Sequence, residues 1–164
     1  MITKIILEGP NNVGKSYLAK KLYDYTNCQI EHLSEKSPNT YNFYYDLLHT
    51  SEPLIFDRFA LSEFVYSEIE HRNSEIDIEN LYTLLNNKKV LVIYVDADYD
   101  FISNSCASKK EVFDYKTILK EKQLFNDLYY TLKHRGINII KVKNHVKPYV
   151  NVFEVIMNIL QEER

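Results

Sequence analysis

The chain has 164 residues, of which 45% are hydrophobic, and this length suits a single domain with a core of its own. Its 20 basic and 23 acidic residues give a net charge of −3, which provides no general electrostatic attraction to nucleic acid or to an acidic membrane. The two cysteines, Cys28 and Cys106, match no metal-binding spacing, so we expect reduced, buried thiols without a disulfide. No apolar run is long enough for a signal peptide or a membrane span, and we expect a soluble, cytoplasmic protein.

Apolar runs alternate with helical patterns along the chain, which is typical of a parallel sheet with helices on both faces. Five runs rich in Ile, Val and Leu predict buried parallel strands: Thr3–Leu7, Gln29–Leu33, Leu54–Asp57, Val90–Asp96 and Ile137–Val142. The helices are predicted at Ser16–Tyr25, Tyr41–His49, Leu61–Glu70, Ile78–Leu85, Asp114–His134 and Pro148–Gln161. The fifth of these helices ends before Gly136, where a left-handed cap is needed, and Pro148 suits the first turn of the last helix.

The first strand leads into a complete G-x-x-x-x-G-K-[ST] loop, which runs from Gly9 to Ser16 through Pro10, Asn11, Asn12, Val13, Gly14 and Lys15, with Tyr17 opening the next helix. The backbone N–H groups of such a loop wrap a β-phosphate, because glycine permits the backbone angles and the close approach. Lys15 would place a charge between the β- and γ-phosphates, and Ser16 would offer a hydroxyl to Mg²⁺. The sequence therefore predicts a site for nucleotide phosphates.

A second polar pair follows the third strand, where Asp57 and Arg58 end the run Pro53-Leu-Ile-Phe. The carboxyl ends of parallel strands meet at one edge of the sheet, so these residues should lie beside the phosphate loop. Asp57 could hold a Mg²⁺-bound water, and Arg58 could reach the transferring phosphoryl group or an acceptor oxygen. Asp96, which ends the fourth strand, is a rival for the metal role, although we expect it to cap the helix that follows.

Together these residues resemble the thymidylate kinase-like group of P-loop nucleoside and nucleotide kinases, including its short phage and viral members. The likeness spans most of the chain and rests on Leu7-Glu8-Gly9, on Asp57-Arg58, on the run Ser62-Glu63-Phe64-Val65-Tyr66 with Arg72 after it, and on Tyr94-Val95-Asp96-Ala97. The loop itself is common to many NTPases, whereas the run after Asp57-Arg58 is more selective.

The resemblance implies a three-layer α/β/α fold with a five-stranded sheet in the order 2-3-1-4-5, ATP and Mg²⁺ as donor, and a deoxynucleoside or its monophosphate as acceptor. It also implies that Arg58 contacts the 5′ end of the acceptor, that Asp57 supports the metal and that Glu8 lies near the acceptor side of the loop. Other candidates for acceptor binding are Ser62, Glu63, Arg72 and the aromatic residues Tyr41, Phe59, Phe64 and Tyr66. A homodimer through helices near residues 60–85 is common in similar enzymes.

The resemblance weakens at the catalytic arginine that thymidylate kinases carry in the phosphate loop or in a lid. The chain has only four arginines, of which Arg58 and Arg72 are the catalytic candidates, and Arg135 and Arg164 are expected at the surface. The expected lid, Ser103–Glu111, offers Lys109 and Lys110 instead. This departure leaves room for a nucleoside kinase, which needs a carboxylate base, and the candidates are Glu31, Glu35 and Asp57. Adenine is expected near Asn144–Lys147, after the fifth strand.

Three functions remain open at this point. The first is phosphoryl transfer from ATP to a small nucleoside or nucleotide, and the second is a similar transfer to a DNA end or a modified base, against which the low net charge argues. The third is a nucleotide-hydrolysing switch or ATPase. The D-x-x-G and N-K-x-D sequences that a GTPase needs are absent.

Overall fold

The computed structural model describes residues 1–146 and 151–162. Its strands are β1 (Lys4–Glu8), β2 (Gln29–His32), β3 (Leu54–Asp57), β4 (Val90–Ala97) and β5 (Ile139–Asn144). Its helices are α1 (Lys15–Thr26), α2 (Tyr41–Leu48), α3 (Ala60–Glu70), α4 (Ile78–Leu85), α5 (Tyr99–Ser108), α6 (Tyr115–His134) and α7 (Val152–Glu162). Within these residues no helix has the length and apolar character needed to cross a bilayer.

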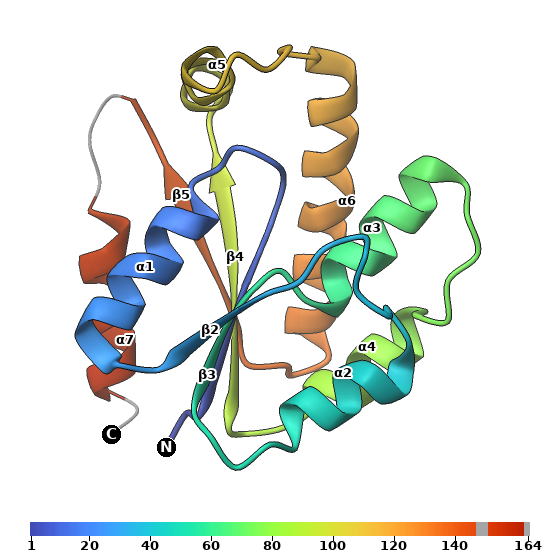
Figure 1. Ribbon diagram of the computed structural model, residues 1–164, viewed down its shortest axis with the longest axis vertical. Coiled ribbons are helices and arrows are strands. Elements are labelled where there is room, and N and C mark those ends of the chain that lie inside the picture. The colour runs from blue at the N-terminus through green and yellow to red at the C-terminus, as the bar shows by residue number, and fades with distance from the viewer. Residues whose placement is uncertain (147–150, 163–164) are drawn as a thin grey trace.

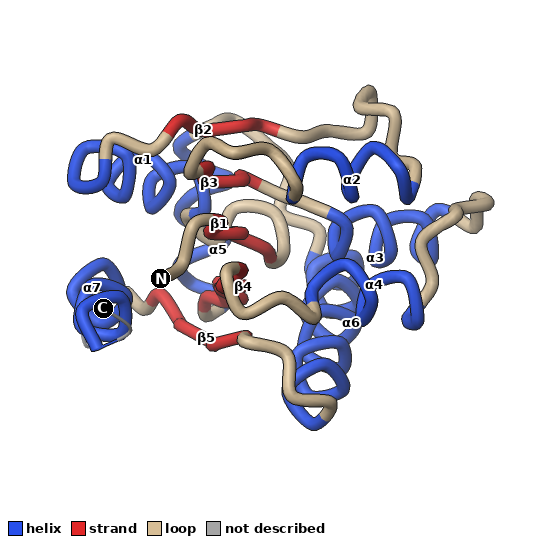
Figure 2. The backbone as a smooth tube through the Cα atoms, turned by 90° about the horizontal axis from the view of Figure 1, so that it is seen from below, coloured by secondary structure: helices blue, strands red, loops and turns tan. Residues whose placement is uncertain are grey.

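The five strands form one parallel sheet in the order β2-β3-β1-β4-β5, which confirms the predicted fold class (Figure 1). Helices α1 and α7 lie on one side of the sheet and α2, α3, α4 and α6 on the other, as Figure 2 shows along the strands. Each side has its own apolar core. Ile6, Phe56 and Phe125 belong to one, and Leu7 and Ile93 belong to the other. Because β1, β3 and β4 are buried on both faces, their carboxyl ends are held firmly at one edge.

Several details differ from the predictions for physical reasons. Strand β2 lies at the edge of the sheet and is largely exposed, so it is not the buried strand that its Ile and Leu residues indicate. Strand β5 begins two residues late, because Ile137 still donates its N–H to Leu132 in the turn after α6. Gly136 adopts the expected left-handed conformation, with φ of 84°. Of the two cysteines, Cys106 is buried and Cys28 is only partly so, and both are free thiols.

The assignment of Asp96 as a helix cap is wrong. The N-cap of α5 is Asp98, whose side chain accepts from the N–H of Phe101 at 2.8 Å. Asp96 is buried and instead forms ion pairs with Lys122 and, at 3.7 Å, with Lys141. It therefore connects β4 to α6 and β5.

A helix was expected after Asp96, but the predicted ranges gave no bounds for α5. The segment Ser103–Glu111, expected as a lid, lies for the most part within it. Pro148, the predicted start of the last helix, and Arg164 lie outside the described residues.

Candidate active site

The phosphate loop depends on glycine at both ends. Gly9 has φ of +146°, and a Cβ there would lie 2.0 Å from the carbonyl oxygen of Val95 at the end of β4. Gly14 has φ of +96°, and a Cβ there would lie 2.9 Å from Nδ2 of Asn144. The same Asn144 amide donates to the carbonyl of Val13 at 2.7 Å. The loop is therefore packed against the ends of β4 and β5, and side chains at its two glycines would displace it.

Lys15 begins α1 and turns its ammonium group back into the loop. It is 5% exposed, and its Nζ donates to the carbonyl of Gly9 at 2.9 Å and to that of Pro10. Burial, together with the nearby charge of Arg58, lowers the pKa of Lys15 to about 7. Among the described residues, no carboxylate lies at hydrogen-bond distance from this nitrogen. A phosphate group beside it would favour the charged form.

Ser16 and Asp57 meet at the junction of α1 and β3. The Ser16 hydroxyl donates to Oδ2 of Asp57 at 2.6 Å, and Nδ1 of His32 lies 3.0 Å from the same oxygen. A hydroxyl and a carboxylate beside a phosphate loop are the oxygen donors that Mg²⁺ prefers when phosphate groups complete its coordination. These residues therefore fit a Mg²⁺ ion bound together with a nucleotide.

Arg58 follows β3 in an unusual backbone conformation. Its φ is 75°, which is costly for a residue with a side chain, while its N–H donates to the carbonyl of Leu7 at 3.0 Å. The guanidinium donates to Oδ1 of Asn11 in the phosphate loop and lies 5.5 Å from the ring centre of Tyr66. The strained backbone thus carries this arginine beside the loop.

Two cavities adjoin at this edge of the sheet. The P-loop cavity, of about 800 Å³, is lined by loop residues and by Lys15, Ser16, Tyr17, His32, Asp57, Lys109 and Glu111, among others. The α3 cavity, of about 610 Å³, is lined by Ser34, Glu35, Asn39, Tyr44, Phe59, Ser62, Glu63, Tyr66 and Arg72, among others. Arg58 and Asn11 line both. The two cavities therefore lie next to each other, with Arg58 in the lining of both.

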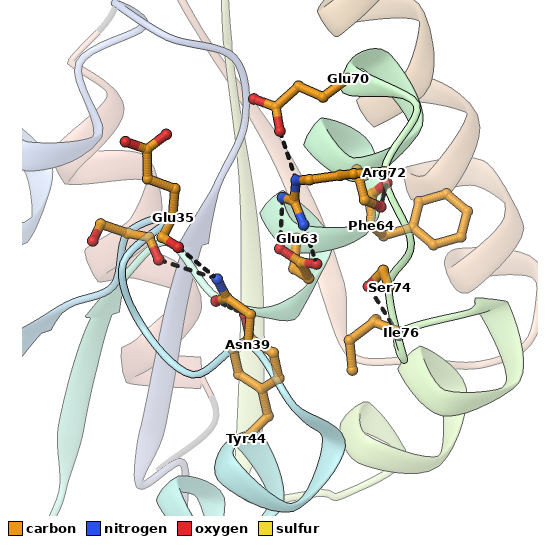
Figure 3. A network of polar contacts seen from close by, with 11 residues as sticks. Glu35, Asn39, Tyr44, Glu63, Phe64, Glu70, Arg72, Ser74 and Ile76 are labelled. Carbon is orange, nitrogen blue, oxygen red and sulfur yellow. Dashed lines mark hydrogen bonds and ion pairs between the residues drawn. The ribbon is translucent and has the colours of Figure 1, made fainter.

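An ion-pair network of Arg72, Glu63 and Glu70, drawn in Figure 3, lines part of the α3 cavity. Arg72 binds Glu63 in a bidentate manner, with N–O distances of 2.7 and 2.8 Å, and its Nε donates to Glu70 at 2.6 Å. These partners raise the pKa of Arg72, so it stays charged. Asn39 stands nearby in Figure 3 and accepts from the hydroxyl of Tyr44 at 2.7 Å.

Glu8, on β1, stabilises the start of α3. Its buried carboxylate accepts from the N–H groups of Phe59 and Ser62 at 2.8 and 3.1 Å and from the Ser62 hydroxyl at 2.5 Å. Burial raises the pKa of Glu8, while the Ser62 donors oppose that shift. Because Phe59 has no capping side chain of its own, Glu8 satisfies the N-terminus of α3 from β1. It lines neither cavity and is a support for α3.

The segment after α5 touches the phosphate loop through Asn12. Lys109 donates to Oδ1 of Asn12 at 2.7 Å, and Nδ2 of Asn12 donates to Glu111 at 2.8 Å and to the thiol of Cys106 at 3.4 Å. Lys109 lines the P-loop cavity, whereas Lys110 does not. The two expected lid lysines therefore differ in position.

Some of the other predicted site residues lie away from the cavities, and others line one of them. Tyr41 stacks on Tyr45, and Phe64 packs against the apolar core beside α3. Among the candidate bases, Glu35 lines the α3 cavity and Asp57 the P-loop cavity, while Glu31 is exposed on β2 and lines neither. Of the segment expected to adjoin adenine, Lys147 lies outside the described residues.

Sequence reasoning missed Glu121, which lines both cavities. It is 4% exposed and accepts from the N–H of Asn11 at 3.0 Å and from the hydroxyl of Tyr66 at 3.2 Å. A signal was present: Glu121 falls at helical spacing on the apolar stripe that includes Ile118 and Phe125. A charged residue on such a stripe must find polar partners inside the protein.

Comparison with solved structures finds the same arrangement of elements elsewhere. The YorR protein of Bacillus subtilis, solved in complex with phosphorylated GDP, matches with a TM-score of 0.82 at 21% identity over 98% of this chain and 97% of its own. Thymidylate kinase from Candida albicans matches with a TM-score of 0.66 at 17% identity, over 98% and 92%. Deoxyadenosine kinase from M. mycoides with bound dCTP gives 0.62 at 18%, over 97% and 99%.

No family model and no curated protein sequence matches the chain. At these identities the likeness concerns the fold alone. The strand order of this chain, β2-β3-β1-β4-β5, is the one expected for a P-loop kinase fold. The chain therefore has the α/β fold of the P-loop kinases.

Proposed function

We propose that the chain is a kinase that transfers the γ-phosphoryl group of ATP to a nucleoside or a nucleoside monophosphate. The observation that carries this proposal is the pair of cavities that adjoin at Arg58, one built on a phosphate loop and the other on α3. A transfer reaction needs two substrates held with their reacting atoms in contact, and a protein that only hydrolyses a nucleotide needs no second cavity of about 610 Å³.

On the donor side, the N–H groups of the loop and the Lys15 ammonium would hold the triphosphate. Ser16 and Asp57 would hold Mg²⁺, which supplies positive charge on the phosphate oxygens when bound. Arg58 would face the γ-phosphoryl group as its charge shifts toward the leaving oxygen. The short distance between Ser16 and Asp57 supports this assignment.

On the acceptor side, the α3 cavity offers the surfaces that a nucleoside needs. Phe59, Tyr66 and Tyr44 contribute aromatic surface for a base, and Glu63 with Arg72 presents hydrogen-bond acceptors and donors side by side. Its volume lies within the range of roughly 300–1,000 Å³ that is usual for small-molecule sites. Structures of M. mycoides deoxyadenosine kinase hold dCTP or dATP, and this supports a nucleotide-related ligand for the same fold.

The proposal is tested with γ-labelled ATP and a panel of acceptors, namely free deoxynucleosides, their monophosphates and an oligonucleotide with a free 5′ end. We expect label on at least one small acceptor with the wild-type chain and none with the Lys15→Met variant. Label on the oligonucleotide alone would make the protein a polynucleotide kinase, and release of phosphate regardless of acceptor would make it an ATPase. Either result contradicts the proposal.

The two lysines after α5 give a matched pair of variants. Lys109→Met should lower kcat by about 10- to 100-fold, because its ammonium lines the P-loop cavity 2.7 Å from Asn12. Lys110→Met should leave kcat within about twofold, since exposed charges away from a site contribute little. Steady-state rates at saturating ATP measure both. Equal losses in the two variants, or a loss only at Lys110, would exclude Lys109 from the reaction.

A further inference from the structure

Five residues line both cavities and therefore mark the place where two substrates would meet: Asn11, Leu33, Arg58, Thr117 and Glu121. Among these five, Arg58 is the only cation and Glu121 the only carboxylate. The reacting atoms of a donor in one cavity and an acceptor in the other would lie near these two side chains.

Glu121 is held in place by uncharged donors. Its Oε2 accepts from the N–H of Asn11 at 3.0 Å and from the hydroxyl of Tyr66 at 3.2 Å, and its Oε1 accepts from Nδ2 of Asn11 at 3.4 Å. No ion pair of residues 1–146 and 151–162 includes Glu121. A buried carboxylate without a paired cation is expensive to keep, and its oxygens remain able to accept a further hydrogen.

The other carboxylates are placed less well for the acceptor's reacting atom. Asp57 lines only the P-loop cavity, where Ser16 and His32 occupy one of its oxygens. Glu35 is exposed and lines only the α3 cavity, while Glu31 lines neither. Position alone therefore favours Glu121 over the three bases that the sequence suggests.

We propose that Glu121 accepts the proton of an attacking hydroxyl, and that the acceptor is therefore a nucleoside with a free hydroxyl group and not a monophosphate. This inference rests on the proposed kinase function. The hydroxyl oxygen forms a bond to the γ-phosphorus, the bond from that phosphorus to the bridging oxygen of ATP breaks, and ADP leaves with the bond's electrons. The hydroxyl proton passes to the Glu121 carboxylate and from there to water.

The charges of the α3 cavity agree with an uncharged acceptor. Four carboxylates line it (Glu35, Glu63, Glu70 and Glu121) against three cations (Lys36, Arg58 and Arg72). The charge of Arg72 is already balanced by Glu63 and Glu70, so it offers less net positive charge to a phosphate. A monophosphate would bring close to two negative charges beside the buried Glu121, whereas a nucleoside would bring none.

The charged and titratable groups that face Glu121 come from three other parts of the fold. Lys15 at the start of α1 and Arg58 after β3 are basic residues that line the P-loop cavity together with Glu121. Tyr66 of α3 is a donor whose pKa is raised by burial and by Glu121 itself, so its hydroxyl stays protonated. In each of its hydrogen bonds to Asn11 and Tyr66, Glu121 is the acceptor.

The test compares Glu121→Gln with Glu68→Gln, which changes an exposed glutamate of α3 that lines neither cavity. In Glu121→Gln the new side chain keeps an oxygen for the Asn11 N–H but cannot take up a proton. We expect kcat for a nucleoside to fall roughly 100-fold in Glu121→Gln, with the KM for ATP within about threefold, and kcat to stay within about threefold in Glu68→Gln. In the wild type kcat should fall at acidic pH, and this acidic limb should disappear in Glu121→Gln.

Each other outcome overturns the inference in a recognisable way. If the wild type phosphorylates monophosphates and no nucleoside, the kinase proposal stands and the role of Glu121 is wrong. If Glu121→Gln raises the KM for ATP and leaves kcat unchanged, the residue only positions the loop. If the wild type labels no acceptor and behaves like Lys15→Met, the kinase proposal itself fails.

Discussion

Replacing Lys15 with methionine is expected to abolish phosphoryl transfer and to raise the melting temperature of the protein. Transfer should fall by roughly 10³-fold, because the variant loses the cation that faces the phosphates. Stability should rise because Lys15 is a buried ammonium whose hydrogen-bond partners, within the part of the chain that the structure describes, are the carbonyls of Gly9 and Pro10. Methionine has a similar length and no charge to bury.

The pH dependence of this stability gain follows from the pKa of Lys15, which burial lowers from 10.5 to about 7. Below about pH 7 the lysine is charged in both the folded and the unfolded chain, so the cost of burying the charge is complete. Between about pH 7 and 10.5 the folded protein has lost the proton while the unfolded chain keeps it, and the cost declines. The advantage of the variant should therefore be largest at or below neutral pH.

Thermal denaturation of both proteins at about pH 6.5 and pH 9 measures this effect, and we expect a gain on the order of 5 °C at the lower pH that shrinks at the higher one. Lys110→Met, which removes an exposed lysine, serves as the control and should show neither change. A lower melting temperature for Lys15→Met at both pH values would show that the ammonium stabilises the loop.

The second large effect concerns Glu8, where alanine and glutamine should behave differently. Glu8→Ala should lower the free energy of unfolding by roughly 2–4 kcal/mol, because the N–H groups of Phe59 and Ser62 and the Ser62 hydroxyl lose their acceptor inside the core. Glu8→Gln should cost about 1 kcal/mol or less, because its oxygen can accept from both N–H groups and its amide can donate to the hydroxyl. The raised pKa of Glu8 agrees with tolerance of a neutral group.

Urea denaturation at neutral pH distinguishes the two variants. Because α3 carries Ser62, Glu63 and Tyr66, Glu8→Ala should also weaken acceptor binding more than ATP binding. Equal destabilisation by alanine and glutamine would mean that Glu8 must be ionised, and the account of α3 capping would need revision.

Local patterns in the sequence were sufficient to predict the sheet and the phosphate loop. Strands β1, β3 and β4 are buried on both faces, so their apolar runs are continuous, and the loop glycines are placed by a fixed spacing. The bounds of α5 could not be predicted, because only Ile102 and Cys106 of its residues are buried and its apolar stripe is short. Asp96 was assigned to a cap because its partners, Lys122 and Lys141, are distant in sequence.

The sequence was sufficient to predict the residues that we propose for the donor side of the site, but only some of those that we propose for the acceptor side. Asp57 and Arg58 follow from the rule that ligands gather at the carboxyl ends of parallel strands. Glu121 lies on α6 and Asn39 precedes α2, and their places in the site depend on how these helices pack against α3 and the loop. Such positions are set by tertiary packing, which no local spacing encodes.

The central claim is that the loop ahead of Lys15 binds the triphosphate of ATP while Arg58 stands between the two cavities. Isothermal titration calorimetry with Mg²⁺ and a non-hydrolysable ATP analogue tests it most directly. We expect the wild type to bind with a Kd in the range of roughly 1 μM to 1 mM, which is usual for substrates of enzymes, and Lys15→Met to show no measurable binding. An absence of binding by the wild type, or equal affinity in the variant, would contradict the account.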